Sequence, residues 1–280
     1  MGAAADTIEL DTRYGRMWAL RGDRYITGCL AAYGEYCEAE ADIFRQLVQP
    51  GATVVEAGAN IGTHTLMLAR ACAPGRLIAF EPQQRIFQLL CANLAANGVA
   101  NVSAFPDALG AAAGVARLPA LDYGGDNNFG AVSPAAGADS GADPGDWAAG
   151  RAVRVTPLDA LALPALHFLK IDVEGWEAEV LRGARETIAR CRPAIYVEND
   201  RADQQATLIG LIAELGYEQY WHVAALYSAG NFKGAAEDFT GGIVSLNMLC
   251  LAKESQAAVA GLERIDPASW RSPVRPIGAP

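Results

Sequence analysis

From about Val54 onward, short apolar runs alternate with segments whose apolar positions recur every three to four residues. The short runs predict strands and the longer segments predict helices. Their alternation is typical of an α/β fold with a mostly parallel sheet covered on both faces. The predicted strands are TVVEAG, RLIAFE, NVSAFP, LHFLKIDV and PAIYVEN. The predicted helices span about 63–73, 84–96, 175–190 and 204–215.

The two ends of the chain depart from this alternation. In the last third, YEQYWHVAALYS and GGIVSLNMLCLA have no convincing helix between them and predict an antiparallel hairpin added to the sheet. Residues 1–50 predict a short β element and a helix that cover the main domain without forming a separate one. The main domain spans residues 51–255. It includes an Ala-, Gly-, Asp- and Pro-rich insertion at about 133–150 that we expect to be flexible, and residues 256–280 form a C-terminal extension.

Composition narrows the choice of partner and compartment. A formal net charge of −10 opposes a non-specific grip on nucleic acid or an anionic membrane, and favours a small-molecule or saccharide partner. The six cysteines form no C-x-x-C pair and have no histidines at metal spacing, so we expect reduced thiols and no zinc site. We find no membrane span and no targeting segment, and expect a cytoplasmic protein. A homo-oligomer is compatible with the sequence.

The stretch from Glu56 to Gly62 reads E-x-G-x-N-x-G between a predicted strand and a predicted helix. Gly58 and Gly62 allow a sharp turn and a close approach of ligand to the backbone around Asn60, while the helix offers its positive end. This suits a carboxylate or a phosphate. The lysine of a phosphate-binding loop and the G-x-G-x-x-G spacing of dinucleotide folds are absent. Because Glu56 repels a pyrophosphate but pairs with an ammonium group, the pattern favours a ligand with an amine and a carboxylate.

The second predicted strand ends at Glu81, where an acid is positioned to accept hydrogen bonds from both hydroxyls of a ribose. An amino-acid group together with a ribose describes S-adenosylmethionine. After the third strand, Asp107 and the backbone of Ala108 are placed to contact the adenine edge. His64, in the first turn of the helix after the glycine loop, either hydrogen-bonds the methionine carboxylate or faces solvent.

Five stretches resemble the FkbM-type S-adenosylmethionine-dependent methyltransferases, a family of the Rossmann-like class I methyltransferases: YGEYCEAE (33–40), VVEAGANIGTHT (54–65), IAFEPQQRIFQLLCANLAANGVANV (78–102), LKIDVEGWEAEVLRGA (169–184) and RPAIYVEND (192–200). The resemblance implies a class I sandwich with a mostly parallel seven-stranded sheet, an antiparallel C-terminal hairpin and a short N-terminal β/helical cover. It also implies O-methylation. Glu56 stands where many members have Asp.

Methyl transfer to a hydroxyl requires that the acceptor be aligned and its proton removed. Candidate groups lie at the carboxyl ends of the strands, where Asp172 and Glu174 follow the fourth strand and Glu198 ends the fifth. We predict Asp172 and Glu198 as catalytic residues and Glu174 as a substrate contact. Alternatively, Asp172 and Glu198 are structural and bond loop amides or Lys170. Such carboxylates also suit a divalent ion, but no spacing motif supports a metal site.

His222, near the end of the sixth predicted strand, is another candidate base because imidazole titrates near neutral pH. A structural role is the alternative. Substrate contacts are also predicted for Tyr36, Trp221, Asn231 and Asn247. Three tryptophans are candidates for a sugar-stacking face, with burial in the core as the alternative: Trp18, Trp176 and Trp221.

The sequence therefore predicts an enzyme that transfers a methyl group from S-adenosylmethionine to a hydroxyl of a sugar, glycan or secondary metabolite. One alternative is a catalytically inactive S-adenosylmethionine-binding protein, against which the intact acids argue. Another is a related transferase on the same fold, such as an aminopropyl transferase that uses the decarboxylated cofactor. The loop spacing disfavours a nicotinamide oxidoreductase, and the composition offers no basic track for nucleic acid.

Overall fold

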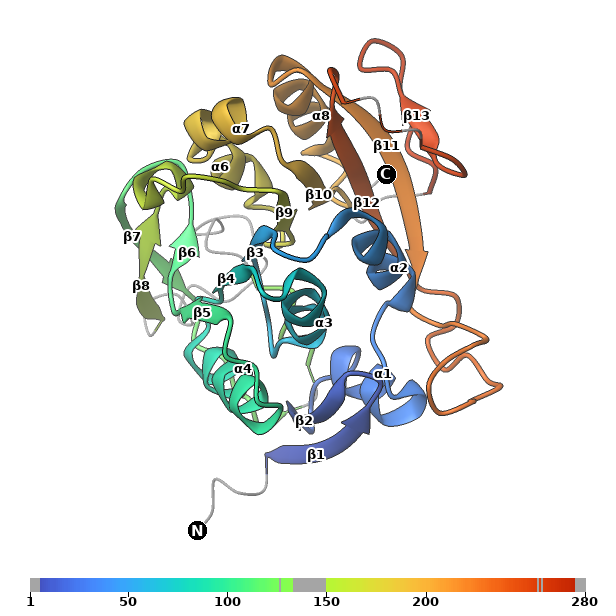
Figure 1. The fold of residues 1–280 in the computed structure, drawn as a ribbon. Helices are drawn as coiled ribbons and strands as arrows, with labels where there is room; N and C mark the ends of the chain where they lie inside the picture. The colour runs from blue at the N-terminus through green and yellow to red at the C-terminus, as the bar shows by residue number, and fades with distance from the viewer. Residues whose placement is uncertain (1–5, 126, 133–149, 256, 258, 275–280) are drawn as a thin grey trace.

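The computed structural model describes residues 6–125, 127–132, 150–255, 257 and 259–274 (Figure 1). Most of the predicted insertion at about 133–150 lies outside the described residues. The described chain is built around a sheet of eight strands in the order β13-β11-β12-β10-β9-β3-β4-β5. Five adjacent strands are parallel to one another, as predicted: β3 (Thr53–Ala57), β4 (Arg76–Phe80), β5 (Val102–Phe105), β9 (Phe168–Ile171) and β10 (Ala194–Glu198).

Each face of the parallel strands packs against a different set of helices. Along β3, Val54 belongs to one apolar core and Val55 to the other, because successive side chains point to opposite faces. The Val54 face is covered by α1 (Ile26–Tyr33), α2 (Glu38–Leu47), α3 (Thr63–Cys72) and α4 (Gln84–Ala96). The Val55 face is covered by α6 (Glu177–Arg182), α7 (Arg185–Cys191) and α8 (Gln205–Glu214). Burial on both faces explains why the strands are continuous apolar runs.

Three of the four predicted helices are confirmed, because α3, α4 and α8 match their predicted spans to within about a residue. The predicted helix at 175–190 is wrong as a single element. It is divided into α6 and α7 at Gly183, where an added Cβ would lie 1.9 Å from the carbonyl oxygen of Gly110. The Asp159 carboxylate accepts the backbone N–H groups of Glu186 and Thr187, which starts a new helix.

The C-terminal hairpin is confirmed: β11 (Tyr217–Ala225) and β12 (Val244–Ala252) are antiparallel, and β12 joins the sheet beside β10. An eighth strand, β13 (Glu263–Ile265), adds one strand to the seven predicted. The sequence analysis also missed a small separate sheet in the order β6-β8-β7. It contains β6 (Ala108–Leu109), β7 (Gly114–Leu118) and β8 (Arg151–Thr156), and a short 3-10 helix η2 (Leu158–Leu161) follows it.

The N-terminal cover consists of a hairpin and two helices. The hairpin, β1 (Thr7–Thr12) and β2 (Gly15–Leu20), lies beside α4 (Figure 1), where the Asn93 side chain bonds both the N–H and the carbonyl of Trp18. Helix α1 packs against the segment between β11 and β12, through the ring contacts of Tyr33 with Tyr227 and Phe239. Segments from both ends of the chain therefore meet near the carboxyl ends of the parallel strands. Among the described helices, none has the length and apolar character that crossing a membrane requires.

Candidate active site

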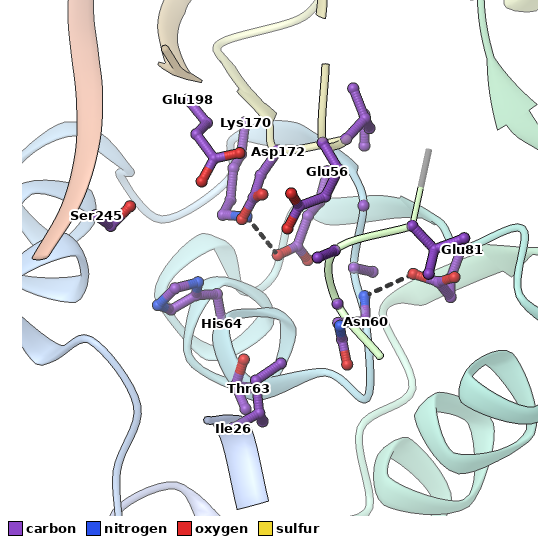
Figure 2. Close-up of a pocket in the computed structure, with 18 of the residues that line it drawn as sticks. Ile26, Glu56, Asn60, Thr63, His64, Glu81, Lys170, Asp172, Glu198 and Ser245 are labelled. Atoms are coloured by element: carbon purple, nitrogen blue, oxygen red, sulfur yellow. Dashed lines mark hydrogen bonds and ion pairs between the residues drawn. The ribbon is translucent and has the colours of Figure 1, made fainter. Parts of the chain in front are cut away.

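A cavity of about 620 Å³ opens at the carboxyl ends of β3, β4, β9 and β10, within the range of sites that hold small ligands. Figure 2 shows Glu81 on one side of Glu56, and Asp172 and Glu198 on the other. We call the region of Asn60, Glu81 and Asp107 the β4 side, and the region of Asp172, Glu174 and Glu198 the β10 side. The cavity brings together most of the predicted residues: Tyr36, Glu56, Gly58, Asn60, His64, Glu81, Asp107, Ala108, Asp172, Glu174 and Glu198.

The glycine loop shapes the floor of the cavity. Gly58 has φ +81°, and a Cβ there would lie 1.8 Å from the carbonyl oxygen of Asp172, so only glycine fits. Gly62, also at positive φ, precedes α3 but does not line the cavity. The amides of the loop bond within the protein: those of Gly58 and Ala59 donate to the carbonyl of Phe80. The loop therefore lets a ligand come close to the backbone and shapes the cavity floor, and it offers few free N–H donors.

Glu81 is fixed by backbone amides on the β4 side. Its Oε2 accepts the N–H of Asn60 at 3.0 Å and its Oε1 accepts the N–H of Gln83 at 2.8 Å. Burial raises the pKa of Glu81 to about 7, although these two hydrogen bonds act in the opposite direction. Each carboxylate oxygen keeps a further lone pair, so the group can still accept two hydroxyls.

Asp107 lies at the outer end of the β4 side. One of its oxygens, Oδ2, contacts the Arg154 guanidinium at 2.7 Å and the Thr156 hydroxyl at 3.3 Å. Arg154 and Thr156 come from β8, so the small sheet that the sequence did not predict holds Asp107 in place. Ala108, the first residue of β6, lines the cavity beside it.

A buried lysine links Glu56 to the β10 side. Lys170 is 2 % exposed, and its Nζ lies 3.0 Å from Asp172 Oδ2 and 4.0 Å from Glu56 Oε1. The carboxylates around it raise the pKa of Lys170, so it stays an ammonium. Burial raises the pKa of Glu56 to about 7 despite Lys170 and a hydrogen bond from Thr65. The sequence signal for this role was a charged residue inside the apolar strand FLKI.

Three carboxylates converge on the β10 side. Oxygens of Asp172, Glu174 and Glu198 lie within 4.8 Å of one another, an arrangement that can hold a divalent cation. Arg201 contacts Glu174 at 2.7 Å, whereas Glu198 Oε2 is buried without a hydrogen-bond partner. Burial, then the charge of Asp172, raises the pKa of Glu174 to about 8 and that of Glu198 well above its usual range. Burial therefore favours the protonated form of Glu198.

His64 enters the cavity from the first turn of α3. It is 4 % exposed, so the alternative of a solvent-facing side chain is wrong. Its Nδ1 lies 3.9 Å from Glu40 Oε2, and its Nε2 is buried without a hydrogen-bond partner. Burial, aided by Lys170, lowers the pKa of His64 to about 3, so the imidazole is neutral. Tyr36 lies beside the His64 ring.

Besides Gly62, four of the predicted site residues lie outside the cavity lining. His222 Nδ1 and the hydroxyl of the buried Tyr196 are hydrogen-bonded at 2.7 Å, which ties the imidazole to the sheet. Trp221 is buried in the core, where its Nε1 donates to a backbone carbonyl and its ring meets Trp270. Asn231 bonds only backbone groups of its own loop. Asn247 donates to Glu40 Oε1 at 3.0 Å and so acts one layer behind the cavity.

The three tryptophans form no common face. Trp176 lines the cavity, Trp221 is in the core and Trp18 lies on the N-terminal hairpin. Sequence reasoning gave no role to several lining residues that come from distant segments, because nothing local marks them: Tyr25, Ile26, Arg201, Leu226, Ile243 and Ser245.

A parallel sheet with helices on both faces, an antiparallel addition at β12 and β11, and acids at the tips of β3 and β4 define a Rossmann-like class I methyltransferase fold. The family model of the methyltransferase FkbM domain matches residues 56–219, more than half of the chain. The chain belongs to the FkbM methyltransferase family, whose cofactor is S-adenosylmethionine.

Comparison with solved structures finds methyltransferases at low sequence identity. A SAM-dependent O-methyltransferase from Thermotoga maritima is 13 % identical, with TM-score 0.45, over 90 % of this chain and 88 % of that one. The precorrin-6y C5,15-methyltransferase from Geobacter metallireducens is 12 % identical, with TM-score 0.45, over 77 % and 89 %. Methyltransferase FkbM from Methylobacillus flagellatus is 15 % identical, with TM-score 0.42, over 75 % of this chain but half of that one. No curated protein matches the chain significantly.

Proposed function

We propose that the cavity binds S-adenosylmethionine on its β4 side and that a hydroxyl of a sugar, glycan or secondary metabolite is methylated on its β10 side. The observation that carries this proposal is the position of Glu81 and of the Asp172, Glu174 and Glu198 group on opposite sides of one cavity.

The β4 side fits the cofactor in chemistry. Glu81 has acceptor capacity for the two ribose hydroxyls, and Asp107 with the backbone of Ala108 borders the place for the adenine. Glu56 supplies negative charge for the ammonium group. The buried, unpartnered Nε2 of His64 needs a partner, and as a neutral imidazole it can donate a hydrogen bond to the methionine carboxylate.

The β10 side fits the removal of a proton. The bound cofactor supplies an activated methyl group, so the chain itself must orient the acceptor and take its proton. Asp172, ion-paired with Lys170, is the carboxylate we assign to accept that proton. Burial favours the protonated form of Glu198, and in that form the carboxyl group can donate a hydrogen bond that orients the acceptor oxygen. Two neighbouring carboxyl groups thus take different roles because their surroundings differ.

The charges of the cavity support an uncharged acceptor over nucleic acid. Only two cationic side chains, Lys170 and Arg201, line it among the described residues. The acids that line it are Glu40, Glu56, Glu81, Asp107, Asp172, Glu174, Glu198 and Asp200. A phosphate backbone would be repelled by this lining, in addition to the net charge of the whole chain.

Calorimetric titration of the purified protein with S-adenosylmethionine, S-adenosylhomocysteine and NAD, without added metal, tests the proposal. We expect saturable binding of both sulfur nucleosides and none of NAD. Binding of NAD alone, or of none of the three ligands, would reject the proposed cofactor site. Once cofactor binding is established, methyl transfer to neutral sugars and hydroxylated metabolites is the test of the acceptor class.

A further inference from the structure

A second cavity of about 240 Å³ lies between the start of α6 and the β10–α8 connection. It is smaller than the roughly 300–1,000 Å³ of sites that hold a whole small ligand, so it suits one part of a larger ligand. It shares Trp176, Asp200 and Arg201 with the main cavity. The two cavities are therefore adjacent, and a ligand on the β10 side of the main cavity borders the wall of the second one.

The shared wall has the chemistry that recognises a sugar ring. Trp176 is held in place because its Nε1 donates to the carbonyl of Leu109 at 3.0 Å, which fixes the aromatic ring as a platform. Arg201 Nη2 contacts Glu174, while its buried Nε lies 3.4 Å from Asp200 Oδ1 without forming a hydrogen bond. Gln204 lies across the cavity against Gly175 and adds amide donors and an acceptor. Planar polar groups beside an aromatic face suit a ring that carries hydroxyls.

The charges that line the second cavity are already compensated. Glu179 is paired with Arg182, and the Glu177 carboxylate accepts the backbone N–H groups of Val173 and Gly175. Arg201 is engaged by two acids, Glu174 and Asp200. Since no excess of positive charge is left among these residues, an uncharged group fits the cavity better than a phosphate or a carboxylate.

We propose that the second cavity is a subsite for a further sugar ring of the acceptor, and that the acceptor is a neutral oligosaccharide or glycoside whose reacting ring lies in the main cavity. This inference rests on the proposed function and narrows its acceptor class.

The test uses the full-length protein saturated with S-adenosylhomocysteine, and two variants. Thr207, on an exposed position of α8, lines the second cavity, so Thr207→Trp fills it. Ala206→Trp introduces the same side chain at the neighbouring exposed residue, which lines neither cavity. Binding of cellobiose, maltose, lactose and xylobiose is compared with that of glucose, galactose and xylose by saturation-transfer NMR and calorimetry.

We expect at least one disaccharide to bind at least about tenfold more tightly than its constituent monosaccharides. In Thr207→Trp the affinity for that disaccharide should exceed the affinity for its monosaccharides by no more than about twofold. Ala206→Trp should keep the full difference, and both variants should bind S-adenosylhomocysteine as tightly as the wild-type protein. The subsite proposal is overturned if no disaccharide binds more tightly than its monosaccharides, or if the tighter binding persists in Thr207→Trp. Neither result affects the proposed cofactor site. If the wild-type protein does not bind S-adenosylhomocysteine, the proposed function fails, and the subsite with it.

Discussion

On the β4 side of the cavity the central acid is held by backbone amides, whereas on the β10 side the acids are held by charged side chains. Glu81 is fixed by the amides of Asn60 and Gln83, two residues of the motifs on either side of it. Asp172 and Glu174 depend on Lys170 and Arg201 for their counter-charges. The position of Glu81 is therefore set by hydrogen bonds from the backbone, and the β10 side is an electrostatic balance that one substitution can upset.

The largest expected effect is on the β10 side. Asp172→Asn keeps the shape of the side chain but removes the proton acceptor, so turnover under saturating acceptor should fall by roughly 10²- to 10⁴-fold. The affinity for S-adenosylhomocysteine, measured by calorimetry, should change by less than about threefold. Normal turnover in the variant would show that Asp172 does not accept the proton. Loss of S-adenosylhomocysteine binding would show that Asp172 belongs to the cofactor site.

Lys170→Met tests whether Glu56 and Asp172 share one buried counter-charge. Removing a buried partner leaves Glu56 and Asp172 without their ammonium, and such a loss costs about 3–5 kcal/mol of unfolding free energy. Urea denaturation of the variant checks this, with the exposed Lys253→Met as the matched control, which we expect to stay within about 0.5 kcal/mol of wild type. Equal stability of both variants would show that Lys170 is not the shared counter-charge.

Glu81→Ala is the corresponding test of the β4 side. Loss of two charge-assisted hydrogen bonds to the ribose should weaken cofactor binding by roughly 100-fold or more, while the circular dichroism spectrum stays that of the folded protein. Glu81→Gln keeps one oxygen acceptor, so its affinity for the cofactor should lie between that of Glu81→Ala and that of the wild-type protein. If a folded Glu81→Ala protein retains full affinity, Glu81 does not bind the cofactor.

The same difference explains how far the sequence alone could go. Glu81 was predicted because its place at the tip of a strand follows from the strand pattern itself. The position of His222 against Tyr196 depends on which residues face each other across β10, β12 and β11, and a local pattern does not contain that register. Strands β13 and β6 were missed because they have only three and two residues, and β7 and β8 because small and charged residues interrupt their apolar positions.

The raised pKa values of Glu56 and Glu81 make the free energy of unfolding depend on pH. In the ligand-free protein, burial raises the pKa of Glu56 and of Glu81 from 4.5 to about 7. Between about pH 4.5 and pH 7 the folded protein therefore holds protons that the unfolded chain has released. The free energy of unfolding should fall as pH rises through this window, by roughly 1–3 kcal/mol per group.

Cofactor binding should show the opposite trend. S-adenosylmethionine carries positive charge and favours the ionised acids, so its affinity should rise from pH 6 to pH 8 with release of protons, which calorimetry in buffers of different ionisation enthalpy detects. Because Glu81→Gln removes one of the titrating groups, it should flatten the stability profile below pH 7. The pH dependence of stability that remains in this variant belongs to Glu56 and to the β10 side, where the pKa of Glu174 is raised to about 8. An unchanged profile in Glu81→Gln would mean that the β4 side is not a titrating part of the cavity and that its acid is held as a carboxylate throughout.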